Sequence, residues 1–147
     1  MQALIGRHEH SLDAKNRLFV PSRFRDQLNE EGGKQFHLAA GLDGCLHLFL
    51  PSQWDQFLTD LKSQQFKSPQ EKRKIERAIY QNAADAPLDD QGRILVPQRL
   101  KDFAGLNKEV VVVGVGRRAE IWDKQSYEKV EKSDLADFKK ISAGLDL

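Results

Sequence analysis

Two short turns hold the side chains of this chain that are best suited to bind a charged ligand. The first spans residues 13–17 and reads Asp-Ala-Lys-Asn-Arg, and the second spans residues 89–93 and reads Asp-Asp-Gln-Gly-Arg. Lysine, arginine and glutamine side chains reach phosphate groups and the hydrogen-bonding edges of bases. The sequence therefore predicts four candidate contacts to a nucleic acid: Lys15, Arg17, Gln91 and Arg93.

The same turns also have a purely structural interpretation. An aspartate at the start of a turn commonly accepts hydrogen bonds from the backbone that follows it, so Asp13 is expected to cap its turn and pair with Arg17. A structural turn does not need two cations at its tip, however, and this one carries Lys15 as well as Arg17. The two interpretations stay open for a single turn, and the presence of a second turn favours binding.

Both turns lie within a longer internal repeat. Residues 12–26 read LDAKNRLFVPSRFRD and residues 88–102 read LDDQGRILVPQRLKD, with seven of fifteen positions identical. Unrelated segments of this length share about one position, so the repeat indicates two structural copies. In each copy a Val-Pro step follows the turn, and an arginine stands two residues after the proline. These arginines are predicted to pair with an aspartate three residues on, as Arg23–Asp26 and Arg99–Asp102.

The elements around the turns are predicted to follow one order in both copies: strand, turn, strand, short helix, β-hairpin and helix. In the first copy the ranges are 7–12, 17–20, 21–28, 36–50 and a helix from Pro51; in the second they are 93–96, 97–104, 110–122 and a helix capped by Asp123. Glycine-containing hairpin turns are expected at 41–44 and 114–118. A helix over 68–81, with Ser68 as its N-cap, bridges the copies. Asn16 and Gly92 stand where the basic turns need a positive φ.

Size and charge limit the classes of function. With 147 residues, the chain is predicted to form one compact unit or two small fused units. No stretch has the length of a membrane span, the start has no basic leader before an apolar block, and Cys45 is the only cysteine, so we expect a cytoplasmic location. The 23 basic and 22 acidic residues leave a net charge of +1. Nucleic-acid binding would therefore require locally clustered charges and several copies acting together.

Metal binding is not predicted, although two pairs of metal-ligating residues are present. His8 and His10 share one side of an expected strand, and Cys45 and His47 share one side of another. Such pairs would form a metal site if the strands met. The second copy has other residues at the corresponding positions: Ala84, Ala86, Arg118 and Glu120. We therefore expect neither a metal nor another cofactor.

Enzymatic activity is not predicted either. The adjacent carboxylates Asp89 and Asp90 would point apart on a strand, so they cannot act as a catalytic pair. The sequence contains neither a glycine-rich phosphate loop nor a His-Glu-x-x-His helix. A basic run over 72–77 is diluted by glutamates and is interpreted as a solvated helix face.

Several motifs together resemble the MraZ family of bacterial transcriptional regulators, over about residues 4–130. They are the two Asp-x-x-x-Arg-apolar-apolar-Val-Pro segments, the Gly-Leu-Asp-Gly-Cys-Leu turn at 41–46, Trp54 near the start of a helix, and Ala-Gly-Leu-x-Lys-Glu-Val at 104–110. The resemblance implies an α+β fold, with two tandem swapped-hairpin domains of the AbrB (SpoVT-AbrB) type related by a pseudo-twofold axis. It implies a first domain over 7–53, a helical connector over 54–81, a second domain over 82–125 and a C-terminal helix or tail over 126–147.

The resemblance also implies a function. It implies a ring-shaped homo-oligomer, associated with the nucleoid, that binds short direct repeats in double-stranded DNA upstream of the division and cell-wall gene cluster. The family's DNA-contacting turn falls on Lys15 and Arg17 in the first copy and on Arg93 in the second. Asn16 departs from the glycine usual in the family, but asparagine can adopt the same backbone. The alternative from another class is a structural or protein-interaction ring that does not bind DNA.

Overall fold

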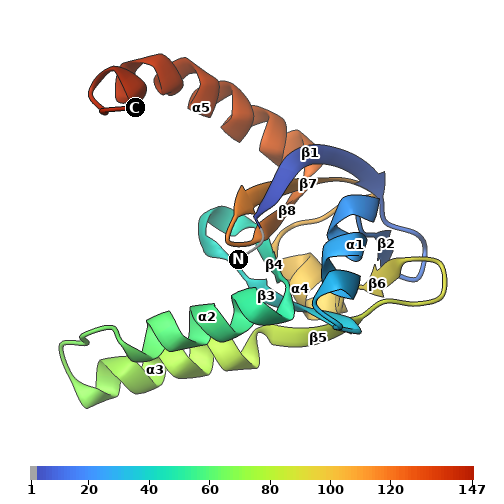
Figure 1. Cartoon of the computed structure of the whole chain (residues 1–147), viewed down its shortest axis with the longest axis horizontal. Helices are drawn as coiled ribbons and strands as arrows, with labels where there is room; N and C mark the ends of the chain where they lie inside the picture. The colour runs from blue at the N-terminus through green and yellow to red at the C-terminus, as the bar shows by residue number, and fades with distance from the viewer. Residues whose placement is uncertain (1–2) are drawn as a thin grey trace.

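The computed structural model describes residues 3–147. The elements in chain order are β1 (Leu4–Ser11), β2 (Arg17–Phe19), α1 (Ser22–Glu30), β3 (Gln35–Ala40), β4 (Leu46–Phe49), α2 (Pro51–Lys62), α3 (Pro69–Gln81), β5 (Ala83–Pro87), β6 (Arg93–Leu95), α4 (Gln98–Phe103), β7 (Glu109–Gly116), β8 (Ala119–Asp123) and α5 (Lys124–Ala143). A short 3₁₀ turn, Leu42–Gly44, joins β3 to β4. Figure 1 shows the strands gathered in one body, from which the paired helices α2 and α3 and the long helix α5 extend as two arms.

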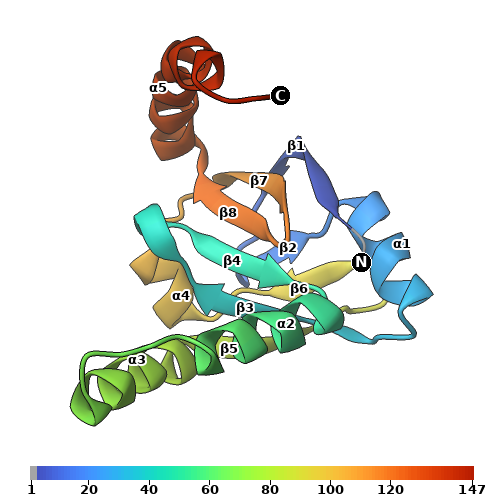
Figure 2. The same ribbon diagram turned by 60° about the vertical axis from the view of Figure 1, so that its left-hand side comes forward.

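Six strands form one antiparallel sheet in the order β1-β7-β8-β4-β3-β5. This order interleaves the copies, because β1 of the first copy pairs with β7 of the second, and β5 of the second pairs with β3 of the first. The two halves meet where β4 pairs with β8, in the middle of the sheet (Figure 2). Each copy thus lends a strand to the hairpin of the other, and the expected duplicated α+β fold is confirmed.

The remaining strands, β2 and β6, form a separate two-stranded antiparallel ribbon. Leu18 and Ile94 oppose each other at its centre, and both side chains are buried. They belong to a core cluster contributed by both copies, which also contains Phe24, Leu38 and Leu100. Burial of each such side chain stabilises the fold by roughly 1.5–3 kcal/mol. Because each copy supplies part of this cluster, neither copy has a complete core by itself.

Reciprocal backbone hydrogen bonds fix the turns to the ribbon. The N–H of Val20 donates to the carbonyl of Gly92 at 3.1 Å, and the N–H of Val96 donates to the carbonyl of Asn16 at 2.8 Å. Asn16 and Gly92 have φ values of 61° and 80°, as predicted from their residue types. The repeats are therefore related by a local twofold axis that passes through the ribbon.

The helix starts agree with the sequence signals. Ser68 Oγ accepts the N–H of Glu71 at 3.1 Å at the start of α3. Asp123 Oδ2 accepts the N–H of Ser126 at 3.4 Å at the start of α5. Beyond its first turns α5 leaves the body, so the apolar side chains of Leu135 and Phe138 are exposed. Within residues 3–147, no helix combines the length and the apolar character that crossing a bilayer requires.

One predicted turn is wrong. The expected turn at 114–118 is shorter, because β7 continues to Gly116 and only Arg117 and Arg118 separate it from β8. The glycine at 114 serves close packing instead of a turn: a Cβ there would lie 2.3 Å from the backbone nitrogen of Ile5 on β1. This close approach could not be predicted from residues near Gly114, because β1 belongs to the other copy of the repeat.

Candidate nucleic-acid interface

Asp13 organises the first basic turn. Its Oδ1 accepts the backbone N–H of Lys15 at 2.8 Å and that of Arg17 at 2.9 Å, and its Oδ2 accepts the Nε–H of Arg17 at 2.8 Å. The backbone N–H of Arg17 is the leading cause that lowers the pKa of Asp13 below its ordinary value. The capping role expected for Asp13 is thus present, and it holds the guanidinium of Arg17 in a fixed position.

The second turn repeats this geometry. Asp89 Oδ1 accepts the backbone N–H of Gln91 at 2.8 Å and that of Arg93 at 2.9 Å, and Asp89 Oδ2 accepts the Nε–H of Arg93 at 2.9 Å. The pKa of Asp89 is lowered, first of all by the backbone N–H of Arg93. The two turns are therefore equivalent in their hydrogen bonds as well as in their sequence.

The turns lie together, at the end of the body opposite the helical arms (Figure 1). Arg93 Nη1 lies 3.5 Å from Asp13 Oδ2, so the two turn arginines meet at one carboxylate oxygen. The guanidinium of Arg93 also lies over the ring of Phe19, 5.8 Å from its centroid. The side chains of Arg17 and Arg93 are 35% and 16% exposed. Both arginines are partly buried and held in place, and they are not buried in the core.

The outward face of the ribbon carries two arginines and two exposed apolar side chains. Because alternate strand residues face opposite sides, the inward direction of Leu18 places Arg17 and Phe19 of β2 outside, where Phe19 is half exposed. Arg93 and Leu95 of β6 lie on the same outward side. Lys15 and Gln91 are exposed in the turns at the ends of the ribbon. A two-stranded β-ribbon of this kind fits the major groove of B-DNA.

Two further cations lie at the turns and are not among the site residues predicted from the sequence. Arg25 of α1 lies against Gly92, where an added Cβ would be 2.7 Å from its Nη1. Lys101 of α4 donates from Nζ to Asn16 Oδ1 at 3.0 Å. Each cation covers the turn of the other copy. The signal was available, because Arg25 and Lys101 occupy equivalent positions of the repeat and keep the same charge.

The helical arginines do not form the ion pairs expected of them. Within residues 3–147, no ion pair joins Arg23 to Asp26 or Arg99 to Asp102. Asp102 instead accepts the side-chain N–H of Gln98 at 2.8 Å. Exposed pairs contribute little free energy, so a nearby amide donor readily replaces the arginine. Arg23 and Arg99 are both exposed, and Arg23 lines a surface hollow with Ile5 and Asp26.

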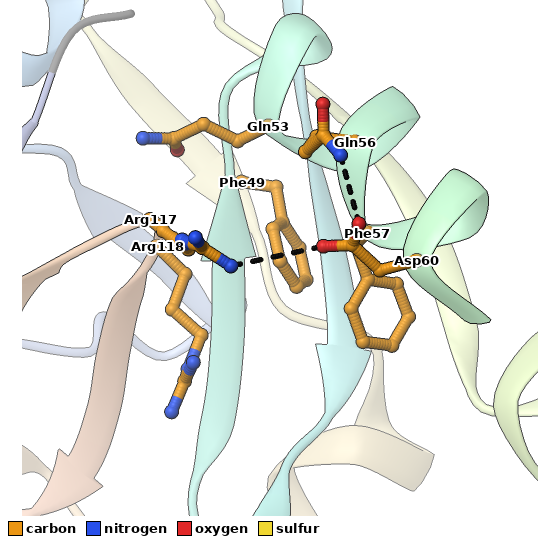
Figure 3. A pocket seen from close by; sticks show the side chains of 7 residues that line it. All are labelled: Phe49, Gln53, Gln56, Phe57, Asp60, Arg117 and Arg118. Carbon is orange, nitrogen blue, oxygen red and sulfur yellow. Dashed lines mark hydrogen bonds and ion pairs between the residues drawn. The ribbon is translucent and has the colours of Figure 1, made fainter. Parts of the chain in front are cut away.

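A small cavity lies away from the ribbon, between α2 and the β7–β8 turn. It is a cavity of about 110 Å³ lined by Phe49, Gln53, Gln56, Phe57, Asp60, Arg117 and Arg118 (Figure 3). An ion pair joins two of these lining residues, with Arg117 Nη1 3.7 Å from Asp60 Oδ2. The cavity is small, and the cation at its rim is already paired. It does not share residues with the two turns.

The sequence as a whole has relatives among known proteins. The family model of the MraZ protein matches residues 3–77 and 79–146, one segment for each repeat. A protein named Transcriptional regulator MraZ from Lachnoclostridium phytofermentans is 42% identical, and the match covers 84% of this chain and 84% of the relative. Another of that name from Pelotomaculum thermopropionicum is 38% identical, with 94% and 92% covered. A family match over nearly the whole of both repeats shows that the chain belongs to the MraZ family.

Proposed function

We propose that this chain is a transcriptional regulator that binds double-stranded DNA through the β2–β6 ribbon and its two turns. The observation that carries the proposal is the meeting of Arg17 and Arg93 at Asp13 on a partly exposed two-stranded ribbon. The names of the relatives support a regulatory role. An enzymatic role has no comparable support.

In this proposal, the turn residues contribute mainly to affinity and the two arginines to sequence specificity. Lys15 and Gln91, exposed in the turns, are placed to contact phosphates and sugars, which position a protein on the duplex. Arg17 and Arg93 are proposed to read guanine, because a guanidinium binds both major-groove acceptors of that base. Each arginine uses its Nε–H on an aspartate, so its terminal N–H groups are held in one direction. This pre-organisation lowers the entropy cost of binding.

We further propose that several chains act together as a ring-shaped homo-oligomer on short direct repeats upstream of the division and cell-wall gene cluster, within the nucleoid. A protomer with a net charge of +1 gains little from charge alone. Linked copies convert later DNA contacts into intramolecular ones, which raises affinity without new contacts. A head-to-tail ring suits direct repeats better than inverted ones. Light scattering combined with size-exclusion chromatography measures the number of chains.

The decisive experiment compares two arginine variants in gel-retardation assays with repeat-containing DNA. Arg17→Ala removes a guanidinium from the ribbon, and we expect it to abolish retardation. Arg117→Ala is the control, because Arg117 is also an arginine in a turn between two strands, but it lies between β7 and β8, away from the ribbon, with a side chain 80% exposed. Equal retardation by Arg17→Ala and the native chain, with oligomer mass unchanged, would show that the turn is not the reader.

The same DNA titrated at two salt concentrations separates this proposal from the alternative of a ring that only binds proteins. Phosphate contacts release counterions, so affinity for DNA falls steeply as salt rises. A ring whose turns only hold hairpins together would show no salt-dependent affinity for DNA.

A further inference from the structure

Three metal-ligating side chains meet on the six-stranded sheet where the two repeats join. Cys45 comes directly before β4, His47 lies two residues later, and Glu120 on β8 is the register partner of His47. One ligand atom from each of the three lies within 4.8 Å of the others. In the sequence, Glu120 is the counterpart of His47 in the other repeat. In the fold, the two counterparts face each other, which is why comparing the copies position by position does not reveal the cluster.

His47 gives an independent indication that a ligand belongs here. Its side chain is only 8% exposed, and among residues 3–147 its Nε2 atom has no hydrogen-bond partner. Glu120 Oε2 lies 3.9 Å from it, which is too far for a hydrogen bond. A Cβ at Gly41 would lie 2.5 Å from His47 Cδ2, so only glycine leaves room for the imidazole in this position. An unpaired buried polar atom costs free energy unless a ligand satisfies it.

The carboxylate of Glu120 is already oriented toward the cluster. Its Oε1 accepts the indole N–H of Trp122 at 3.0 Å. Its Oε2 lies on the side of His47 and is 3.3 Å from Nη2 of Arg118. Outer hydrogen bonds such as the one from Trp122 fix the direction of a ligating group in metal sites.

The charge of the cluster favours a cation over an anion. An anion beside His47 would meet the carboxylate of Glu120 and be repelled. Arg118 now supplies the compensating positive charge, but its side chain is 33% exposed and its buried Nε has no hydrogen-bond partner among residues 3–147. Figure 3 shows Arg117 extending toward Asp60 while Arg118 turns another way. Arg118 can therefore move into solvent when another cation takes its place.

We propose that Cys45, His47 and Glu120 bind one thiophilic divalent cation, with Zn²⁺ as the ion of matching chemistry. Thiolate, imidazole and carboxylate are the ligands that Zn²⁺ takes in proteins, and three protein ligands leave a fourth position for water. Hard cations such as Mg²⁺ and Ca²⁺ prefer oxygen ligands only. Ligand atoms around one zinc lie about 3–4 Å apart, so the cluster needs to contract by about 1 Å.

Binding changes one covalent bond. The Sγ–H of Cys45, which now donates to the carbonyl of Leu42 at 3.1 Å, is replaced by an Sγ–metal bond, and the proton passes to solvent. Because Cys45 and His47 belong to the first repeat and Glu120 to the second, the cation joins the two repeats at the β4–β8 pair.

The test uses the full-length protein after treatment with a chelator, titrated with Co²⁺. We expect one Co²⁺ per chain and the strong near-ultraviolet absorption of a cobalt–thiolate bond, which Zn²⁺ then removes by displacement. Titration of Zn²⁺ against a chromophoric chelator gives its affinity. If saturating Co²⁺ produces no thiolate absorption, the proposal is wrong.

Four variants sharpen the test. Cys45→Ser is expected to remove the thiolate band, and Glu120→Gln, which keeps the side-chain size, to weaken Zn²⁺ binding at least about tenfold. Arg118→Gln is expected to bind Zn²⁺ more tightly, because it removes the competing cation. His37→Asn on the neighbouring strand β3 is the matched control and should leave affinity unchanged. Native affinity in Glu120→Gln, with circular dichroism showing an intact fold, would overturn the assignment, as would weaker binding by Arg118→Gln.

Discussion

Arg93 of the second repeat lies 3.5 Å from Asp13 of the first, measured from Nη1 to the Oδ2 atom that also accepts the Nε–H of Arg17. One carboxylate therefore organises two arginines from different copies. Among residues 3–147, no corresponding ion pair joins Arg17 to Asp89. The ribbon is thus symmetric in its backbone and asymmetric in its charges, which allows mutations to distinguish the two repeats.

The asymmetry predicts unequal effects of equivalent mutations. Asp13→Asn removes charge from contacts to both turn arginines, whereas Asp89→Asn affects only Arg93. We expect Asp13→Asn to lower the thermal unfolding temperature more than Asp89→Asn does. Asp90→Asn, next to Asp89 and exposed, serves as the control and should change little. Equal losses in the first two variants would show that the contact between the copies contributes nothing.

The salt dependence of DNA binding separates phosphate contacts from base contacts. Lys15→Ala is expected to weaken binding to specific and unrelated DNA alike, and to reduce the slope of log K against log salt by about 0.9. Lys74→Ala, an exposed lysine on α3, should leave the slope unchanged. A Lys15→Ala protein that keeps the native slope would remove Lys15 from the interface.

Acid should weaken the fold through the two turn aspartates. Backbone N–H groups of Arg17 and Arg93 lower the pKa of Asp13 and Asp89, so the unfolded chain binds these protons more tightly than the folded protein. Their contribution to the free energy of unfolding is complete above the unfolded carboxyl pKa, about 4, and is lost as pH falls through the lower folded values. The free energy of unfolding, measured with urea across this pH range, should fall less steeply with decreasing pH in the Asp13→Asn, Asp89→Asn double variant than in the native protein. An identical decline would contradict this account.

Crowding at Gly92 can be measured apart from backbone strain. Gly92 and Gly44 have φ values of 80° and 82°, so alanine costs roughly 1–2 kcal/mol at either position. A Cβ at Gly92 would lie 2.7 Å from Arg25 Nη1, whereas at Gly44 no atom lies within 4 Å. We therefore expect Gly92→Ala to be the more destabilising in urea unfolding. If the two variants lose equal stability, Arg25 moves aside without cost.

Zinc should stabilise the native chain by mass action. Free Zn²⁺ at a hundredfold excess over its dissociation constant adds about 2.7 kcal/mol to the free energy of unfolding for a site absent from the unfolded chain. Calorimetry should show that Zn²⁺ raises the unfolding temperature of the native protein and leaves that of Cys45→Ser unchanged. A chelator should reverse the rise, and the same shift in both proteins would place the effect elsewhere.

Sequence reasoning succeeded where the determining forces are local. The duplicated turn, the positive φ at Asn16 and Gly92, and the caps at Ser68 and Asp123 all depend on residues a few positions apart. The pairing of Asp13 with Arg17, four residues later, can likewise be predicted from the sequence.

It failed where distant segments meet. Residues near Gly114 in the sequence do not indicate that β1 packs against it, so its glycine is typical of a turn although its role is a close approach. The position of Arg25 over Gly92 also depends on strands exchanged between the repeats. The same holds for the pairing of His47 with Glu120. Such contacts are set by the register of the whole sheet and not by local propensity.

The pairing of β1 with β7, from Leu4 opposite Gly116 to Ser11 opposite Glu109, has a consequence for biosynthesis. The first strand leaves the ribosome about a hundred residues before its partner, a delay of roughly 5–20 seconds at ordinary elongation rates. Throughout that interval its backbone edge is open to a neighbouring nascent chain. Contacts so distant in sequence also slow folding. On a polysome, the incomplete sheets of neighbouring nascent chains therefore lie close together. We expect chaperones to matter most before the second repeat has been synthesised.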